Sequence, residues 1–314
     1  MRLNRRQAIA LGSAACVARP VFAAPRLQYD IEPVQVASGL WMIEGKTEYF
    51  TSENGGAIVN CALLDSDEGM IIIDTGPSLR YGEALLQVVS QMSPKGVAAV
   101  INTHHHPDHF FGNQVFAGMP VMALGETKAL AQTHGDAFAD NMYLLLGDWM
   151  RGTESVPPNE VVEGGEIVIG GRTLDMIPLV GHTEADLAVL DVETGTLIAG
   201  DLAFLDRAPT TPSADLTLWK QSLDILRGID AAAIIPGHGP FDREKISLDQ
   251  TSDYLIWLEA TLRNGAGEGL DMVEIMAIDP PLHFSKMGAM PQEFHRSVTH
   301  LFADIETSVL PRAN

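Results

Sequence analysis

The segment 102–109 places four side chains that can bind a metal within six residues. Read as His-x-His-x-Asp-His, it contains His104, His106, Asp108 and His109, directly after an apolar run expected to form a strand. Imidazole nitrogens and carboxylate oxygens are the ligand types that suit zinc. The pattern therefore predicts metal-dependent chemistry, and a solvated histidine-rich loop is the alternative.

Three more residues of ligand type follow apolar, strand-like segments later in the chain. They are His182, Asp201 and His238, and each has a glycine as its neighbour. Strand ends at one edge of a sheet are where α/β proteins gather functional residues, and glycine allows the backbone to approach closely. We therefore expect these residues to join the histidine cluster. The two cysteines, Cys16 and Cys61, can form neither a disulfide framework nor a multi-cysteine zinc site.

The elements that must position these residues alternate between strands and helices. Expected strands cover 40–43, 57–64, 70–73, 97–101, 167–169, 174–177, 187–190, 196–199 and 232–235. Expected helices cover 78–92, much of an insert at 125–158, 216–228 and the chain from 242 onward, with a break at 265–269. This order predicts two α/β halves around a core of stacked sheets.

Composition limits the classes of partner. The 314 residues are 46% hydrophobic, which is too apolar for a disordered chain. Acidic residues outnumber basic ones 41 to 20, and the formal net charge of −21 argues against nucleic acid and anionic lipid as partners. No segment is long and apolar enough to predict membrane insertion.

The first 23 residues resemble a secretory signal. Arg5 and Arg6 precede a short apolar run, and Val21-Phe22-Ala23 satisfies a small-x-small cleavage rule. The paired arginines favour the twin-arginine export route and hence the bacterial periplasm. We divide the remainder into a domain at 24–245, which includes the insert 125–158, and a C-terminal helical extension of the same domain at 246–314.

The order of these motifs resembles the metallo-β-lactamase superfamily, and Asp74-Thr75-Gly76 resembles its early Asp-Thr-Gly strand end. The resemblance implies a four-layer αβ/βα sandwich that binds two zinc ions, with iron as the alternative metal. It assigns His104, His106 and His182 to the first metal, Asp108, His109 and His238 to the second, and Asp201 to both. Asp74 would hold the histidine loop in place, whereas His105 occupies a variable position and is not expected to bind metal.

The resemblance implies a hydrolase in which a metal-bound hydroxide attacks an ester, thioester, lactone or amide carbonyl, with Asp108 as both ligand and proton acceptor. The expected substrate surface combines the 44–56 loop with the insert residues Met142, Tyr143, Leu144, Trp149 and Met150. β-Lactam hydrolysis is disfavoured, because lactamases that keep all the histidines generally lack the bridging carboxylate. Two alternatives remain: a mononuclear-iron oxidoreductase similar to persulfide dioxygenases, and a non-catalytic accessory protein.

Two further segments, Asn54-Gly55-Gly56 and Asn60–Leu64, together with the export signal, suggest one group within this superfamily. They look similar to periplasmic zinc metallohydrolases linked with sulfur-oxidation and quinoprotein (pyrroloquinoline quinone) systems. This resemblance implies a small-molecule substrate and a periplasmic quinoprotein dehydrogenase as a partner.

Overall fold

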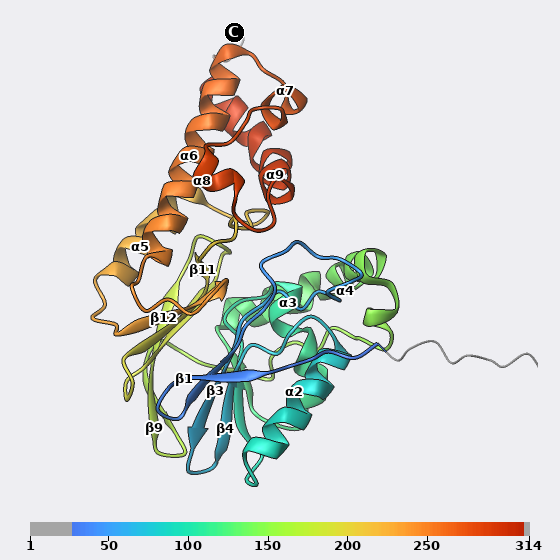
Figure 1. Ribbon diagram of the computed structural model, residues 1–314, viewed down its shortest axis with the longest axis vertical. Coiled ribbons are helices and arrows are strands. Elements are labelled where there is room, and N and C mark those ends of the chain that lie inside the picture. The colour runs from blue at the N-terminus through green and yellow to red at the C-terminus, as the bar shows by residue number, and fades with distance from the viewer. Residues whose placement is uncertain (1–26, 311–314) are drawn as a thin grey trace, which may run out of the picture.

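Two β-sheets lie face to face at the centre of the computed structural model, and helices cover their outer faces (Figure 1). The structure describes residues 27–310, so the predicted signal peptide at 1–23 and Cys16 lie outside the described residues. The layers follow the order helix, sheet, sheet, helix. The predicted four-layer αβ/βα sandwich is therefore confirmed.

The first sheet contains seven strands in chain order, and the second contains five. The first runs β1 (Pro33–Ala37), β2 (Leu40–Ile43), β3 (Cys61–Ser66), β4 (Gly69–Ile73), β5 (Val97–Ile101), β6 (Val121–Ala123) and β7 (Glu160–Val161). The second runs β12 (Ala233–His238), β11 (Thr196–Phe204), β10 (Asp186–Asp191), β9 (Arg172–Leu179) and β8 (Gly165–Ile169). Strands β4 to β7 pair in parallel, as do β11 and β12, and the other neighbours are antiparallel.

Three apolar layers separate the four layers of structure. Strand β4 shows why its residues form an uninterrupted apolar run: Ile71 and Ile73 pack between the sheets, whereas Met70 and Ile72 pack against the helices. Successive side chains of a strand point to opposite faces, so a strand covered on both faces must be apolar throughout.

Helices on the two sides belong to separate cores. The first sheet is covered by α2 (Leu79–Met92), α3 (Pro107–Phe110), η1 (Phe111–Phe116), α4 (Gly125–Leu146) and η2 (Gly147–Met150). The second is covered by α5 (Leu216–Arg227) and α6 (Ser247–Glu268), followed by α7 (Met272–Met276), α8 (Leu282–Ser285) and α9 (Gln292–Val309). None of the helices within residues 27–310 combines the length and apolar character needed to cross a membrane.

Several predicted boundaries were wrong. Residues 57–60 do not extend β3, because Asn60 instead bonds across the molecule to the backbone of the β12 end, including Pro236 and Gly239. Helix α6 continues through the predicted break at 265–269 and ends at Gly269, which adopts the left-handed conformation with φ +77°. The short strands β1, β6 and β7 were not predicted.

The C-terminal helices extend beyond the sheets, where α6 and α9 lie side by side (Figure 1). Both helices bury apolar residues in the core that also covers the second sheet, among them Leu255, Leu262 and Val298. Glu293 of α9 reaches further and forms a buried ion pair with Arg207, which follows β11. These contacts accord with a helical extension of one domain, although the boundary at 246 stays a prediction.

Candidate metal centre

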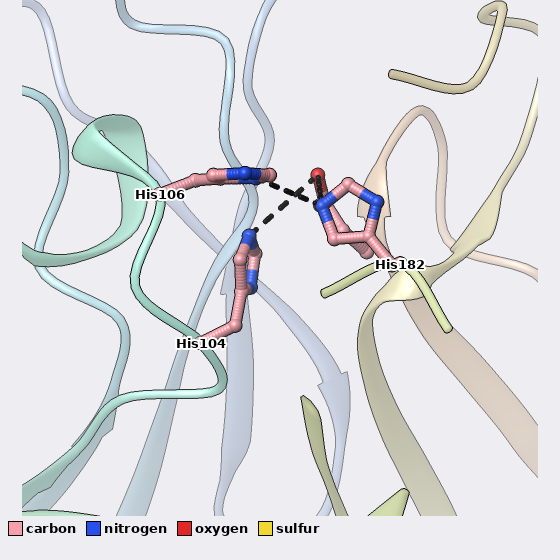
Figure 2. A group of neighbouring side chains, drawn as sticks. His104, His106 and His182 are labelled. Atoms are coloured by element: carbon pink, nitrogen blue, oxygen red, sulfur yellow. Dashed lines mark hydrogen bonds and ion pairs between the residues drawn. The ribbon is translucent and has the colours of Figure 1, made fainter. Parts of the chain in front are cut away.

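Three histidines from two loops converge at the edge where the sheets meet. Figure 2 shows the imidazole rings of His104, His106 and His182 pointing toward one another. His182 Nε2 lies 2.9 Å from His106 Nδ1 and 3.3 Å from Asp201 Oδ2. The donor atoms of these four buried residues all lie within 4.8 Å of one another. One divalent ion could therefore be held by nitrogen and carboxylate donors together.

The second cluster lies next to the first and is made by Asp108, His109 and His238. Asp108 Oδ2 lies 3.4 Å from His238 Nε2 and 3.7 Å from His109 Nε2. All three residues are buried. These separations match those between donors around a single tetrahedral ion whose bonds are about 2.0–2.2 Å long.

Asp201 joins the two clusters through its two carboxylate oxygens. Its Oδ2 faces the first cluster, at 3.3 Å from His182 Nε2. Its Oδ1 faces the second, at 3.2 Å from both His109 Nε2 and His238 Nε2. This is the geometry of a carboxylate shared by two neighbouring ions. The structure thus brings together all seven residues predicted as ligands.

Local backbone geometry explains how these side chains meet. Pro107 begins α3 and His106 is its N-cap in an extended conformation, so the chain turns within the motif. Asp201 lies inside β11 rather than after its end, at an irregularity in the pairing with β12 next to Gly200. A Cβ on Gly237 would lie 2.0 Å from Asp201 Oδ1, so only glycine leaves room for the carboxylate.

Asp74 fixes the histidine loop, as the resemblance implied. This buried carboxylate accepts hydrogen bonds from the backbone N–H of Thr103 at 2.9 Å and the Thr103 hydroxyl at 2.8 Å. It also lies 2.8 Å from His109 Nδ1. Because a carboxylate can only accept, Nδ1 of His109 carries the proton and Nε2 keeps its lone pair for a metal.

Two further contacts orient ligands, and sequence reasoning missed both. His238 Nδ1 lies 2.7 Å from the carbonyl oxygen of Ile58, which again leaves Nε2 free to bind. His106 Nε2 lies 3.3 Å from the hydroxyl of Ser213. Nothing in the local sequence around Ile58 or Ser213 signals these roles, because both partners are distant in the chain.

The electrostatics of the pocket suit cations. Burial lowers the pKa of His104 well below its ordinary value and that of His182 to about 3, so both imidazoles are neutral. Burial would also lower the pKa of His109, but the carboxylates of Asp201 and Asp74 outweigh it and raise that pKa. Four buried atoms of the cluster residues lack a hydrogen-bond partner: His104 Nε2, His109 Nε2, His182 Nδ1 and Asp201 Oδ1. Unsatisfied donor atoms of this kind fit divalent metal ions.

His105 lies outside both clusters. Its ring is buried, 5.8 Å from the ring of Phe138 and 6.0 Å from that of His134, both on α4. It therefore packs against α4 and belongs to neither group of converging ligand atoms.

A pocket opens over both clusters and reaches His106, Asp108, Asp201 and His238. Its apolar wall comes from the 44–56 loop and α4, and its polar wall from the segment after β11 and from α9. The lining includes Tyr49, Phe50, Ile58, Phe138, Asn141, Met142, Leu145, Arg207, Thr210, Pro212, Ser213 and Arg296. The structure thus gives the metal clusters an adjacent space with mixed polarity.

Only part of the expected substrate surface lines this pocket. Met142 does, together with Tyr49 and Phe50 of the 44–56 loop. Trp149 and Met150 are buried in the helix-side core, and the Trp149 indole anchors the loop by donating to the Ser52 carbonyl oxygen at 2.8 Å. Tyr143 and Leu144 are exposed on α4.

The chain belongs to the metallo-β-lactamase superfamily, whose family model matches residues 54–238. A structure described as a metallo-β-lactamase from Pontibacter korlensis has a TM-score of 0.59 and 23% identity, covering 72% of this chain and 99% of that one. A β-lactamase domain protein from Burkholderia ambifaria has a TM-score of 0.66 and 21% identity, with 90% of both chains covered. At these identities the likeness concerns the fold.

Several of the curated relatives are named as hydrolases, of different kinds. A linear primary-alkylsulfatase of a Pseudomonas species is 23% identical over 76% of this chain and 53% of its own length. The human acyl-coenzyme A thioesterase MBLAC2 is 25% identical over 58% of this chain and 74% of its own. The chain spans only 53–61% of the length of the first three curated relatives. Membership of the metallo-β-lactamase superfamily, which the sequence motifs predicted, is thus confirmed.

Proposed function

We propose that the protein is an exported, dinuclear-zinc hydrolase that cleaves an ester, thioester, lactone or amide. The observation that supports this most directly is the position of Asp201, whose two oxygens face two separate clusters. A single-metal site would need no such shared carboxylate. Two adjacent ions, when bound, acidify water and polarise a carbonyl oxygen.

The residues of the chain divide this work between them. His104, His106 and His182 would hold one ion, and Asp108, His109 and His238 the other. Asp108 has a second role, because it both belongs to a cluster and lines the pocket. Its carboxylate is placed to orient the attacking water and to accept its proton.

The names of the relatives favour two substrate classes. Acyl-coenzyme A thioesterases and a hydroxyacylglutathione hydrolase appear among them, which supports a thioester. The alkylsulfatase matches the largest share of this chain and supports a sulfate ester as a second candidate. We retain the expectation that β-lactams are poor substrates.

We also propose that the protein works in the periplasm with a quinoprotein dehydrogenase as its partner. This proposal rests on the N-terminal sequence and on the resemblance of segments 54–56 and 60–64. The mononuclear-iron oxidoreductase and the non-catalytic accessory protein remain the alternatives.

Metal analysis followed by a substrate panel tests the proposal. Protein purified from the periplasm should contain two zinc ions per chain and hydrolyse at least one ester, thioester, lactone or sulfate ester. One iron per chain, with oxygen consumed in the presence of a persulfide, would instead support the oxidoreductase. Two metals without turnover of any member of the panel would support the accessory role.

A further inference from the structure

Helix α9, at the C-terminal end of the chain, supplies a cationic side chain to the pocket over the metal clusters. Arg296 lines this pocket together with Asp108 and Asp201. Its side chain is 28% exposed, so it is neither buried in the core nor free in solvent. The family model ends at residue 238, so Arg296 lies outside the matched region.

A second arginine that lines the pocket, Arg207, already has hydrogen-bond partners within the protein. Arg207 donates to the carbonyl oxygen of Ala208 at 3.1 Å, to the hydroxyl of Thr210 at 3.3 Å and to the carboxylate of Glu293 at 3.1 Å. It is only 1% exposed. Arg207 therefore holds the wall together, and its charge is neutralised by Glu293.

Arg296, by contrast, retains donors for a ligand. Its Nη1 lies 3.7 Å from Glu293 Oε2, which is longer than a hydrogen bond, and Glu293 already pairs with Arg207. Two arginines share one carboxylate, which leaves one positive charge at this wall.

A local cation matters in a chain whose formal net charge is −21. The overall field repels anions, so an anionic ligand needs a specific partner at the site. A guanidinium suits this task, because it presents paired donors that match a carboxylate or sulfonate. The opposite wall, from Phe50, Phe138 and Leu145, suits an apolar chain.

We propose that Arg296 determines specificity by binding an oxyanion group on the substrate, so that the preferred substrate is an ester or thioester with a carboxylate, sulfonate or sulfate elsewhere in the molecule. This inference rests on the proposed hydrolase function. The scissile group would lie at Asp108 and the anionic group at Arg296, and both residues line the same pocket.

Two esters of matched length test the inference on the zinc-loaded protein. Mono-(4-nitrophenyl) glutarate carries a free carboxylate, and 4-nitrophenyl pentanoate is its neutral counterpart. The measured quantity is the ratio of kcat/KM for the two esters. One charge-assisted hydrogen bond contributes about 1.5–3 kcal/mol, so Arg296→Gln should lower this ratio about 10- to 150-fold, mainly through KM of the glutarate ester.

Two control variants separate this role from others. Arg296→Lys keeps the charge and should retain part of the preference. Arg263→Gln removes an arginine of α6 that is likewise paired with a glutamate of its own helix, but it lies outside the pocket lining and should leave the ratio unchanged. An unchanged ratio in Arg296→Gln, or an equal loss for both esters, would overturn the inference. A lower ratio in Arg263→Gln would overturn it too, since long-range charge would then explain the preference.

Failure of the proposed function can be told apart from failure of the inference. If the wild-type protein hydrolyses neither ester, the ester assignment fails, and calorimetric titration with monomethyl glutarate and methyl pentanoate decides the inference. Binding of the anion that weakens at least tenfold in Arg296→Gln supports it. Binding that is the same in both proteins refutes it, because the metals or another group would then hold the carboxylate.

Discussion

Replacing Asp74 with asparagine should weaken the second metal cluster more than the first, because Asp74 contacts His109 directly and His104 only through the Thr103 hydroxyl. Asp74 accepts from three donors, two on Thr103 and one on His109. An asparagine amide has one acceptor oxygen, and its NH₂ group would face a donor. The conflict can be relieved if the His109 ring changes tautomer, but the proton then moves to Nε2, the nitrogen that should bind the metal.

The size of this effect follows from the contacts. Either the hydrogen bond between Asp74 and His109 is lost, or it is kept by a tautomer that cannot bind metal. A hydrogen bond to a charged group contributes about 1.5–3 kcal/mol. If all of this free energy is lost from metal binding, the affinity of the second cluster for its ion falls about 10- to 150-fold. Loss of groups that orient ligands typically weakens metal affinity about 10- to 100-fold.

Chelator competition followed by elemental analysis measures this loss. At a chelator concentration that leaves two ions bound to each wild-type chain, Asp74→Asn should retain only one bound ion per chain. Asp186→Asn is the matched control: this buried carboxylate also accepts from three donors, on His182 and Thr183, but none is an imidazole nitrogen. It should lower thermal stability without a selective loss of the second ion. Equal metal loss in the two variants would refute the tautomer argument.

Three other predictions concern the candidate site and the export signal. With excess zinc, Asp108→Asn should lower kcat by about 10²–10⁴-fold without unfolding the protein; near-normal turnover would make Asp108 a ligand alone. His104→Ala should remove most of the metal from one cluster, whereas His105→Ala should retain both ions by elemental analysis; equal losses would mean that the motif is misaligned. Arg5→Lys combined with Arg6→Lys should leave precursor in the cytoplasm on fractionation, and normal export would point to the general secretory route.

The sequence was informative about the fold where hydrophobic pattern and hydrogen bonding agree. Residues 70–73 are apolar throughout because β4 is covered on both faces, and helix α2 begins after a capping serine, Ser78. The same reasoning failed at 57–60, where three of the four residues are apolar but the backbone N–H of Asn60 donates to Gly237 of β12, far away in sequence. Short strands such as β6 carry too few residues to show a period.

The seven candidate ligands were predictable for a related reason. Four occur in one compact motif and the other three lie next to glycine, so their types and order are visible locally. The residues that tune the site are not: Ser213 contacts His106 across 107 positions, and Glu293 contacts Arg207 across 86. No local pattern distinguishes Arg296 from any other arginine on an amphipathic helix. Such contacts depend on tertiary packing, which the periodicity of a single segment does not encode.

The buried ion pair between Arg207 and Glu293 determines the order in which the parts of the site can form. All seven candidate ligands lie at or before His238, so both clusters can assemble once that part of the chain is available. The guanidinium of Arg207 can pair with the carboxylate of Glu293 only after α9 has been synthesised. During synthesis, all seven candidate ligands are thus present in the chain before the helix that completes this pocket wall. A chain that lacks α9 would leave Arg207 without its carboxylate partner and the pocket without Arg296.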